Sequence, residues 1–127
     1  MKHKTLVRIF SPHLLAVNGN NTRVLVAKLN EKNFDVVLTG RSDFEIESYQ
    51  PNFDSIQVSL KDSSEAEFEM SPDFAGSKNM YLKSLNASIS GVSILDAGHF
   101  HINSAKYDIA DTSAIVLSGT TLRKNGR

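Results

Sequence analysis

The chain has 127 residues with 14 basic and 14 acidic side chains, so it carries no formal net charge. This length predicts a single domain over residues 1–127, large enough to bury a hydrophobic core. Balanced charge argues against a nucleic-acid binder, which would present a basic surface. No stretch approaches the roughly 18 apolar residues of a membrane span. The absence of cysteine excludes disulfides and thiolate chemistry.

The N-terminal part of the chain predicts short extended segments. Residues 5–17 are largely apolar but are divided at Pro12, which removes a backbone donor, so two strands are expected rather than one helix. The segment Val17-Asn18-Gly19-Asn20-Asn21 is a turn signal, because Asn and Gly tolerate positive φ. It predicts a β-hairpin around residues 18–23.

From residue 34 onward, one arrangement of apolar and polar positions occurs in four copies. Two apolar residues spaced two apart are followed by a serine and then by two more apolar residues. The serine always lies six residues after the first apolar position, whereas the copies begin 22, 29 and 20 residues apart. The copies are Val36, Leu38, Ser42, Phe44, Ile46; Val58, Leu60, Ser64, Ala66, Phe68; Ala87, Ile89, Ser93, Leu95, Ala97; and Tyr107, Ile109, Ser113, Ile115, Leu117.

This repeat predicts an all-β fold, a right-handed parallel β-helix (solenoid) over about residues 34–122. Each copy would form one coil, with its apolar residues stacked inside and its serine bonded to backbone groups at a bend. An antiparallel β-sandwich is the alternative, because its short strands produce a similar alternation. The constant serine offset favours the solenoid. The expected core includes Phe44, Phe68, Ile89, Ile109 and Ile115.

Three segments resemble a known family. Ser90-Gly91-Val92-Ser93-Ile94-Leu95-Asp96-Ala97 and Asp111-Thr112-Ser113-Ala114-Ile115-Val116-Leu117-Ser118-Gly119 are similar to patterns in the autotransporter-adhesin head GIN domain proteins of Bacteroidetes. Phe53-Asp54-Ser55-Ile56-Gln57-Val58 resembles that family's opening strand. The resemblance covers about residues 34–122. It implies a β-helical scaffold without established catalytic residues, and an extracytoplasmic location. Residues 1–17 do not read as a signal peptide, so the sequence itself leaves localisation open.

Acidic residues are concentrated in the middle of the chain. Nine of the fourteen lie between residues 43 and 73. In a solenoid, Glu45 and Glu47 would lie beside Glu67 and Glu69 on the next coil. Like charges facing each other across strands destabilise a sheet by roughly 0.2–1 kcal/mol each. These four residues therefore predict either a solvated face or a face that recruits a cation or a basic partner.

His99 and His101 are weak candidate metal ligands. Residues two apart on a strand point to one face, so both imidazoles could ligate one ion, with Asp96 or Asp108 as a third ligand. The alternative is two solvated histidines and no metal, which we favour. The chain has no Gly-x-Ser-x-Gly elbow and no phosphate-binding loop. We therefore predict no catalytic residue, no cofactor and no enzymatic activity.

The outer face is expected to change from acidic to apolar along the chain. Ala114 and Val116 occupy outward positions in the fourth copy, where the first two copies carry acids. A strand that is apolar on both faces predicts cover on both sides. That cover could come from the N-terminal strands, residues 6–26, folding back, or from a second subunit in a homodimer.

These features predict a non-catalytic, adhesin-like surface or periplasmic solenoid, which binds a cell-surface ligand through an extended face. One alternative is a carbohydrate-binding or carbohydrate-active β-helix that uses the acidic face. Exposed Tyr49, Tyr81 or Tyr107 beside the acids would be its signature. Another alternative is a cytosolic structural module that self-associates through its stacked ends.

Overall fold

The computed structural model describes residues 5–10, 16–76 and 79–117, with β1 described through its backbone alone. These residues form eleven strands: β1 (Thr5–Phe10), β2 (Ala16–Asn20), β3 (Thr22–Leu29), β4 (Asn33–Thr39), β5 (Asp43–Ser48), β6 (Asn52–Leu60), β7 (Glu65–Met70), β8 (Met80–Ile89), β9 (Ile94–Ala97), β10 (Phe100–Ile109) and β11 (Ala114–Leu117). This part of the chain contains no helix, and hence none long and apolar enough to cross a membrane.

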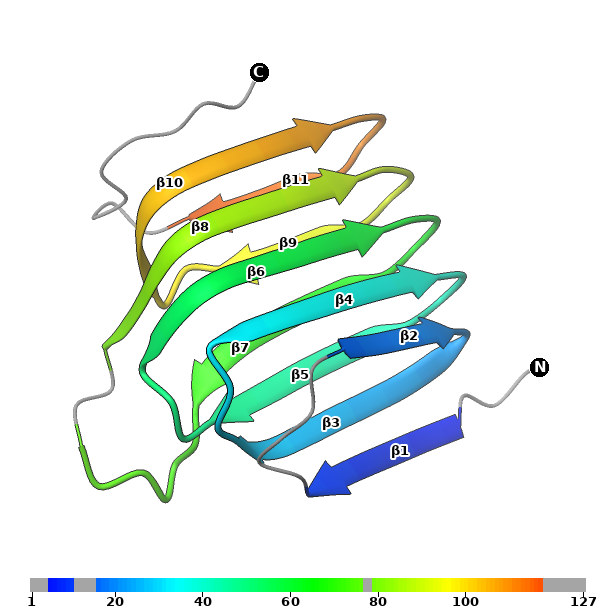
Figure 1. The fold of residues 1–127 in the computed structure, drawn as a ribbon. Helices are drawn as coiled ribbons and strands as arrows, with labels where there is room; N and C mark the ends of the chain where they lie inside the picture. The colour runs from blue at the N-terminus through cyan, green and yellow to red at the C-terminus, as the bar shows by residue number, and fades with distance from the viewer. Residues whose placement is uncertain (1–4, 11–15, 77–78, 118–127) are drawn as a thin grey trace.

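The strands form two parallel sheets. The six-stranded sheet has the order β1-β3-β5-β7-β9-β11, and the five-stranded sheet has the order β10-β8-β6-β4-β2. Because successive strands alternate between the sheets, the chain winds as a β-solenoid of about five turns. Figure 1 shows that the coil is right-handed, as parallel crossover connections almost always are. The predicted solenoid is therefore confirmed, and the β-sandwich is excluded.

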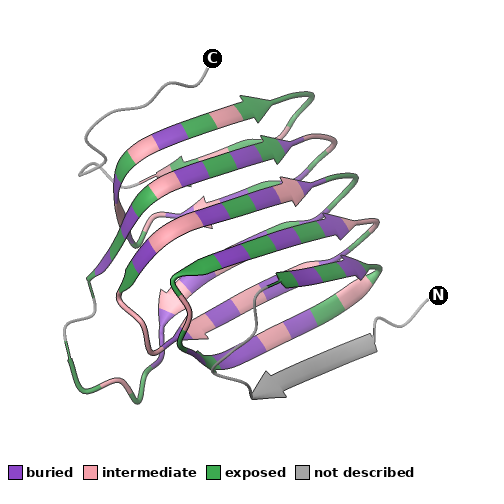
Figure 2. Cartoon of the chain, viewed as in Figure 1, coloured by how far each residue is buried: buried purple, intermediate pink, exposed green. Residues whose placement is uncertain are grey.

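The pairing register follows the predicted repeat. The first apolar positions of the four copies, Val36, Val58, Ala87 and Tyr107, are aligned on neighbouring strands of the five-stranded sheet. The positions after the serine are aligned in the same way in the six-stranded sheet, where Ala66 pairs with Leu95. Burial alternates along these strands, so one side chain in two enters the space between the sheets (Figure 2).

A chain of aromatic contacts runs through this core. The ring centroids of Phe34 and Phe44 are 5.9 Å apart, those of Phe44 and Phe68 are 6.0 Å apart, and those of Phe68 and Phe100 are 5.8 Å apart. Phe53 meets Phe100 edge-to-face at 5.6 Å. Aromatic pairs at such distances add to the stability gained by burial alone. The rings therefore connect successive coils to one another.

The serines of the repeat lie at one corner of the coil, between the two sheets. Ser42, Ser64 and Ser93 are fully buried. Ser42 Oγ donates to the Thr39 carbonyl at 2.8 Å, and Ser64 Oγ donates to the Lys61 carbonyl at 3.0 Å. The serine hydroxyls thus satisfy backbone groups that the strand ladder does not reach, as predicted.

The residue two positions before each of the four repeat serines, Ser113 included, has positive φ. The values are 67° at Gly40, 67° at Asp62, 76° at Gly91 and 61° at Asp111. A Cβ on Gly91 would lie 2.3 Å from the Asp62 carbonyl oxygen, so only glycine fits there. The two aspartates also bond the preceding coil, because Asp62 Oδ2 accepts from the Gly40 N–H at 2.8 Å and Asp111 Oδ2 accepts from the Gly91 N–H at 2.9 Å.

The hairpin predicted around residues 18–23 is wrong. β2 pairs in parallel with β4, and β3 pairs in parallel with β1 and β5. The Asn-Gly turn signal marks a corner that passes the chain from one sheet to the other. The repeat therefore begins before residue 34, with Thr22 at the serine position, where its N–H donates to Ser42 Oγ at 3.2 Å.

Two core assignments near the C-terminus need correction. Phe44, Phe68 and Ile89 are buried as predicted, but 39% of Ile109 is exposed and Ile115 is only half-buried. The cause is position, because β10 and β11 are the last strands of their sheets. The N-terminal strands do not cover the outward residues Ala114 and Val116 of β11, since β1 lies at the opposite end of the six-stranded sheet.

Ile89 and Ile109 offer a matched test of this correction, because they are register partners with different burial. Ile89 is 1% exposed, so Ile89→Ala should lower the free energy of unfolding by about 2–5 kcal/mol. Ile109→Ala should cost less than half as much, because much of its side chain already contacts water. Urea unfolding followed by circular dichroism measures both values. Equal losses would show that the last coil is covered in solution.

Candidate functional site

Carboxylates from three adjacent strands line up on the outer side of the six-stranded sheet. Register pairs join Asp43 to Glu65, Glu45 to Glu67, and Glu47 to Glu69, and they extend from Glu67 to Asp96. This confirms the predicted proximity of the glutamates on β5 and β7. We call the set the acidic ladder, and it consists of Asp43, Glu45, Glu47, Glu65, Glu67, Glu69 and Asp96.

The core positions these acids. Phe44 and Ile46 alternate with acids along β5, and Ala66 and Phe68 do so along β7, and all four apolar side chains are buried. Because side chains of a strand alternate between faces, the glutamates must point outward together. Parallel pairing in register then places acid beside acid on successive coils.

Five members of the acidic ladder line a surface hollow of about 480 Å³, namely Asp43, Glu45, Glu65, Glu67 and Asp96. Arg23 and Leu25 of β3 lie at one side of this hollow, and Ile94 and Val116 lie at the other. Most of the carboxylates are half-buried rather than fully solvated. Their charges therefore interact more strongly with one another than charges on an open surface would.

Two carboxyl groups have shifted proton affinities. A hydrogen bond with Glu45, then partial burial and the charges of Glu45, Glu67 and Glu47, raise the pKa of Glu69 from 4.5 to about 7. Partial burial, followed by the charges of Asp96 and Glu45, raises the pKa of Glu67. A hydrogen bond between two carboxyl groups requires one proton. Glu69 thus keeps its proton to a higher pH than an isolated glutamate would.

The acidic ladder, together with His99, supplies two groups of donor atoms that could hold a metal ion. Glu45, Glu47 and Glu69 form one group, and Glu67, Glu69 and His99 form the other, with the donor atoms of each within 4.8 Å of one another. The first group offers only oxygen ligands. The second adds an imidazole nitrogen, which favours different metals.

The two histidines do not share a face. His99 lies in the turn between β9 and β10, close to Glu67 and Glu69, whereas His101 lies within β10. The His101 ring stacks on Tyr81 with centroids 5.0 Å apart. The geometric premise of a His99–His101 pair is therefore wrong, because it extends a strand through a turn. The contact of His99 with β7 was missed, since it depends on which strands are neighbours.

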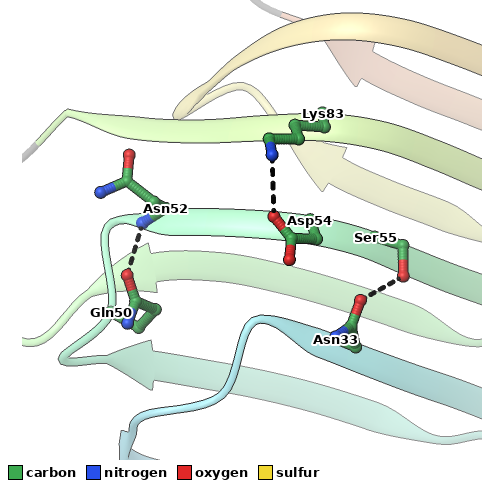
Figure 3. A network of polar contacts seen from close by, with 6 residues as sticks. All are labelled: Asn33, Gln50, Asn52, Asp54, Ser55 and Lys83. Atoms are coloured by element: carbon green, nitrogen blue, oxygen red, sulfur yellow. Dashed lines mark hydrogen bonds and ion pairs between the residues drawn. The ribbon is translucent and has the colours of Figure 1, made fainter.

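The outer side of the five-stranded sheet carries polar side chains, some of which are paired with one another. Figure 3 shows the Lys83 Nζ to Asp54 Oδ1 ion pair, at 3.4 Å, and the Ser55 Oγ to Asn33 Oδ1 hydrogen bond, at 2.7 Å. A shallow groove of about 500 Å³ crosses this side further along the strands, and Gln57 is among its lining residues. Acids and bases are mixed here, in contrast to the acidic ladder.

The tyrosines do not provide the aromatic signature of a sugar site beside the acids. Tyr81 is 46% exposed but belongs to the five-stranded sheet. Tyr49 lies at a corner, against Phe74 and beneath the Lys28 ammonium group, which is 5.8 Å from the ring centroid. Tyr107 packs partly against the core.

The outward positions that carry acids on β5 and β7 are increasingly occupied by apolar residues on the later strands of the six-stranded sheet, as predicted. Glu65 is followed in register by Ile94 and Ala114, and Asp96 is followed by Val116. Ile94 is 39% exposed and Val116 is 47% exposed. The acidic and apolar parts are thus two ends of one face.

Comparison of the chain with protein-family models, with curated proteins and with solved structures finds no match.

The raised pKa of Glu69 predicts a pH dependence of stability. The folded state holds this proton more tightly than the unfolded state, whose pKa is near 4.5. Its contribution to stability is therefore present below about pH 4.5 and is lost as the pH rises through about 7. Glu69→Gln should remove this loss, so the variant should gain melting temperature relative to wild type between pH 5 and pH 8.

Glu65→Gln is the control, since Glu65 lies in the acidic ladder outside the Glu69–Glu45 hydrogen bond. The melting temperature of Glu65→Gln should fall with rising pH nearly as much as that of wild type. Parallel pH profiles of wild type and Glu69→Gln would contradict the hydrogen-bonded carboxyl pair.

Proposed function

We propose that this protein is a non-catalytic, adhesin-like binding module that acts outside the cytoplasm through the acidic ladder. The ligand would be a basic surface on a cell-surface partner. The observation that carries this function is the register of Glu45 with Glu67 and of Glu67 with Asp96 on neighbouring strands. These charges line a hollow and repel one another, and a basic partner would relieve that repulsion.

Electrostatic complementarity supports this function in physical terms. Facing charges of opposite sign accelerate association and select against wrong partners. The acidic ladder belongs to rigid strands, so little ordering is needed on binding. The similarity of residues 90–97 and 111–119 to head GIN domain proteins supports the adhesin-like role and the extracytoplasmic location.

Carbohydrate hydrolysis is the weaker candidate. Glu69, with its pKa of about 7, lies next to Glu45, and a proton-donating acid beside a second carboxylate is the basis of glycosidase chemistry. However, glycosidases separate the two groups by about 5 Å or more to accommodate the sugar. The direct hydrogen bond between Glu69 and Glu45 leaves no such space. Binding without catalysis therefore accounts better for this pair.

Titration with a lysine-rich synthetic peptide tests the binding function. The double variant Glu45→Gln, Glu67→Gln should weaken binding at least about tenfold, and binding should weaken as salt rises. Asp35→Asn with Asp108→Asn makes the same charge change on the five-stranded sheet and should have little effect. If both double variants bind equally weakly, net charge alone explains the interaction and the acidic ladder has no special role.

A homodimer through the apolar end of this face remains a proposal. Ile94, Ala114 and Val116 are exposed and adjacent in register, so a second copy could bury them. Val116→Glu should then convert a dimer to a monomer, as measured by size-exclusion chromatography with light scattering. A wild-type protein that stays monomeric at high concentration would contradict the dimer.

A further inference from the structure

We propose that Glu67, Glu69 and His99 form a binding site for one divalent transition-metal ion, of which Zn²⁺ is the best fit. This goes beyond the proposed function, because an ion held by three donor atoms requires no basic partner. The donors come from two separate elements, the strand β7 and the turn between β9 and β10.

β7 fixes the backbone positions from which the two glutamate side chains extend. Glu67 and Glu69 flank Phe68, which is buried and contacts the rings of Phe44 and Phe100. Because Phe68 points inward, the two glutamates must share the outer face. The core therefore fixes the side of the sheet on which both glutamates lie, and their rotamers set the distance between the carboxylates.

The turn at residues 98–99 brings the imidazole to these carboxylates. Glu67 is the register partner of Asp96, so the turn that follows β9 starts beside β7. Asp96 Oδ1 accepts a hydrogen bond from the Gly98 N–H at 3.0 Å, which fixes the start of the turn. The flanking residues Ala97 and Phe100 are each 1% exposed, so the turn is anchored on both sides.

The donor set selects the class of metal. Imidazole nitrogen suits Zn²⁺ and similar ions, whereas Ca²⁺ and Mg²⁺ prefer oxygen ligands alone. The donor atoms lie within 4.8 Å of one another, which rotamer adjustment can reduce to the about 3.3 Å separation implied by zinc–ligand bonds of about 2.0–2.1 Å. His99 is exposed, so a fourth position stays open to water or to a group from a partner.

The electrostatics of the acidic ladder favour such an ion. A divalent cation would neutralise Glu67 and Glu69, whose charges are opposed by Glu45, Glu47 and Asp96.

Isothermal titration of the full chain with Zn²⁺ at pH 7.5 tests the site. Wild type should bind one ion with a dissociation constant on the order of micromolar, and far more tightly than Ca²⁺. His99→Ala and Glu69→Gln should each weaken binding at least about tenfold. The controls carry the same substitutions elsewhere, His101→Ala on the five-stranded sheet and Glu65→Gln beside the site, and both should bind zinc as wild type does.

Two further measurements distinguish zinc binding at His99 from zinc binding at the other histidines. A His3→Ala, His13→Ala variant should retain zinc binding, and NMR should show the His99 ring signals, rather than those of His101, shifting on zinc addition. Binding no tighter than millimolar, or equal losses for His99→Ala and His101→Ala, would overturn the site. Wild-type protein that binds zinc but not the lysine-rich peptide would refute only the proposed function. Wild-type protein that binds the peptide but not zinc would refute only the metal site.

Discussion

In-register parallel stacking is the constraint on which this structure depends. Each residue of a coil lies beside its equivalents, about 4.8 Å above and below. Inside the coil this constraint is favourable, because Phe44 and Phe68 can meet ring to ring. Outside it is costly, because Glu45 must lie beside Glu67. The same geometry therefore creates both the core and the acidic ladder, and the acids cannot separate without breaking the register.

The serine corner maintains that register. Its hydroxyls bond carbonyl groups within the turn, and Asp62 and Asp111 bond the N–H of a glycine in the preceding coil. Shortening or lengthening this corner would break both sets of bonds. Extra residues are accommodated at the opposite corner, where residues 71–79 separate β7 from β8. This explains why the copies begin at unequal spacings although the serine offset is constant.

Much of the fold was predictable because the repeat contains two signals. Its apolar alternation predicts the strands, and its serine predicts the corner between them. The first coil was missed because Gly19 replaces an apolar residue and Thr22 replaces serine, and the Asn-Gly signal describes only local conformation. Thr22 is an imperfect substitute, since its buried Oγ1 has no hydrogen-bond partner within the described structure. Ile109 has the pattern of a core residue, but no pattern reveals that β10 is the last strand of its sheet in the described part of the chain.

The acidic face was predictable from period 2 and the repeat, whereas the place of His99 was not. Its position depends on a two-residue turn, which breaks the strand period and directs the imidazole toward β7. A histidine that is distant in sequence thus joins two glutamates only because parallel pairing makes β7 and β9 neighbours. Contacts of this kind require the sheet order, which is a property of the whole chain.

The acidic and apolar ends of the outer face reinforce one another. Ile94 and Val116 line the same hollow as Glu67, and partial burial is the largest cause of the raised pKa of that carboxyl. Apolar neighbours exclude water and lower the local dielectric response, which strengthens repulsion among the acids and attraction to any cation. The last coils thus help to create the electrostatic character of the acidic ladder, although they contribute only Asp96 to its charge.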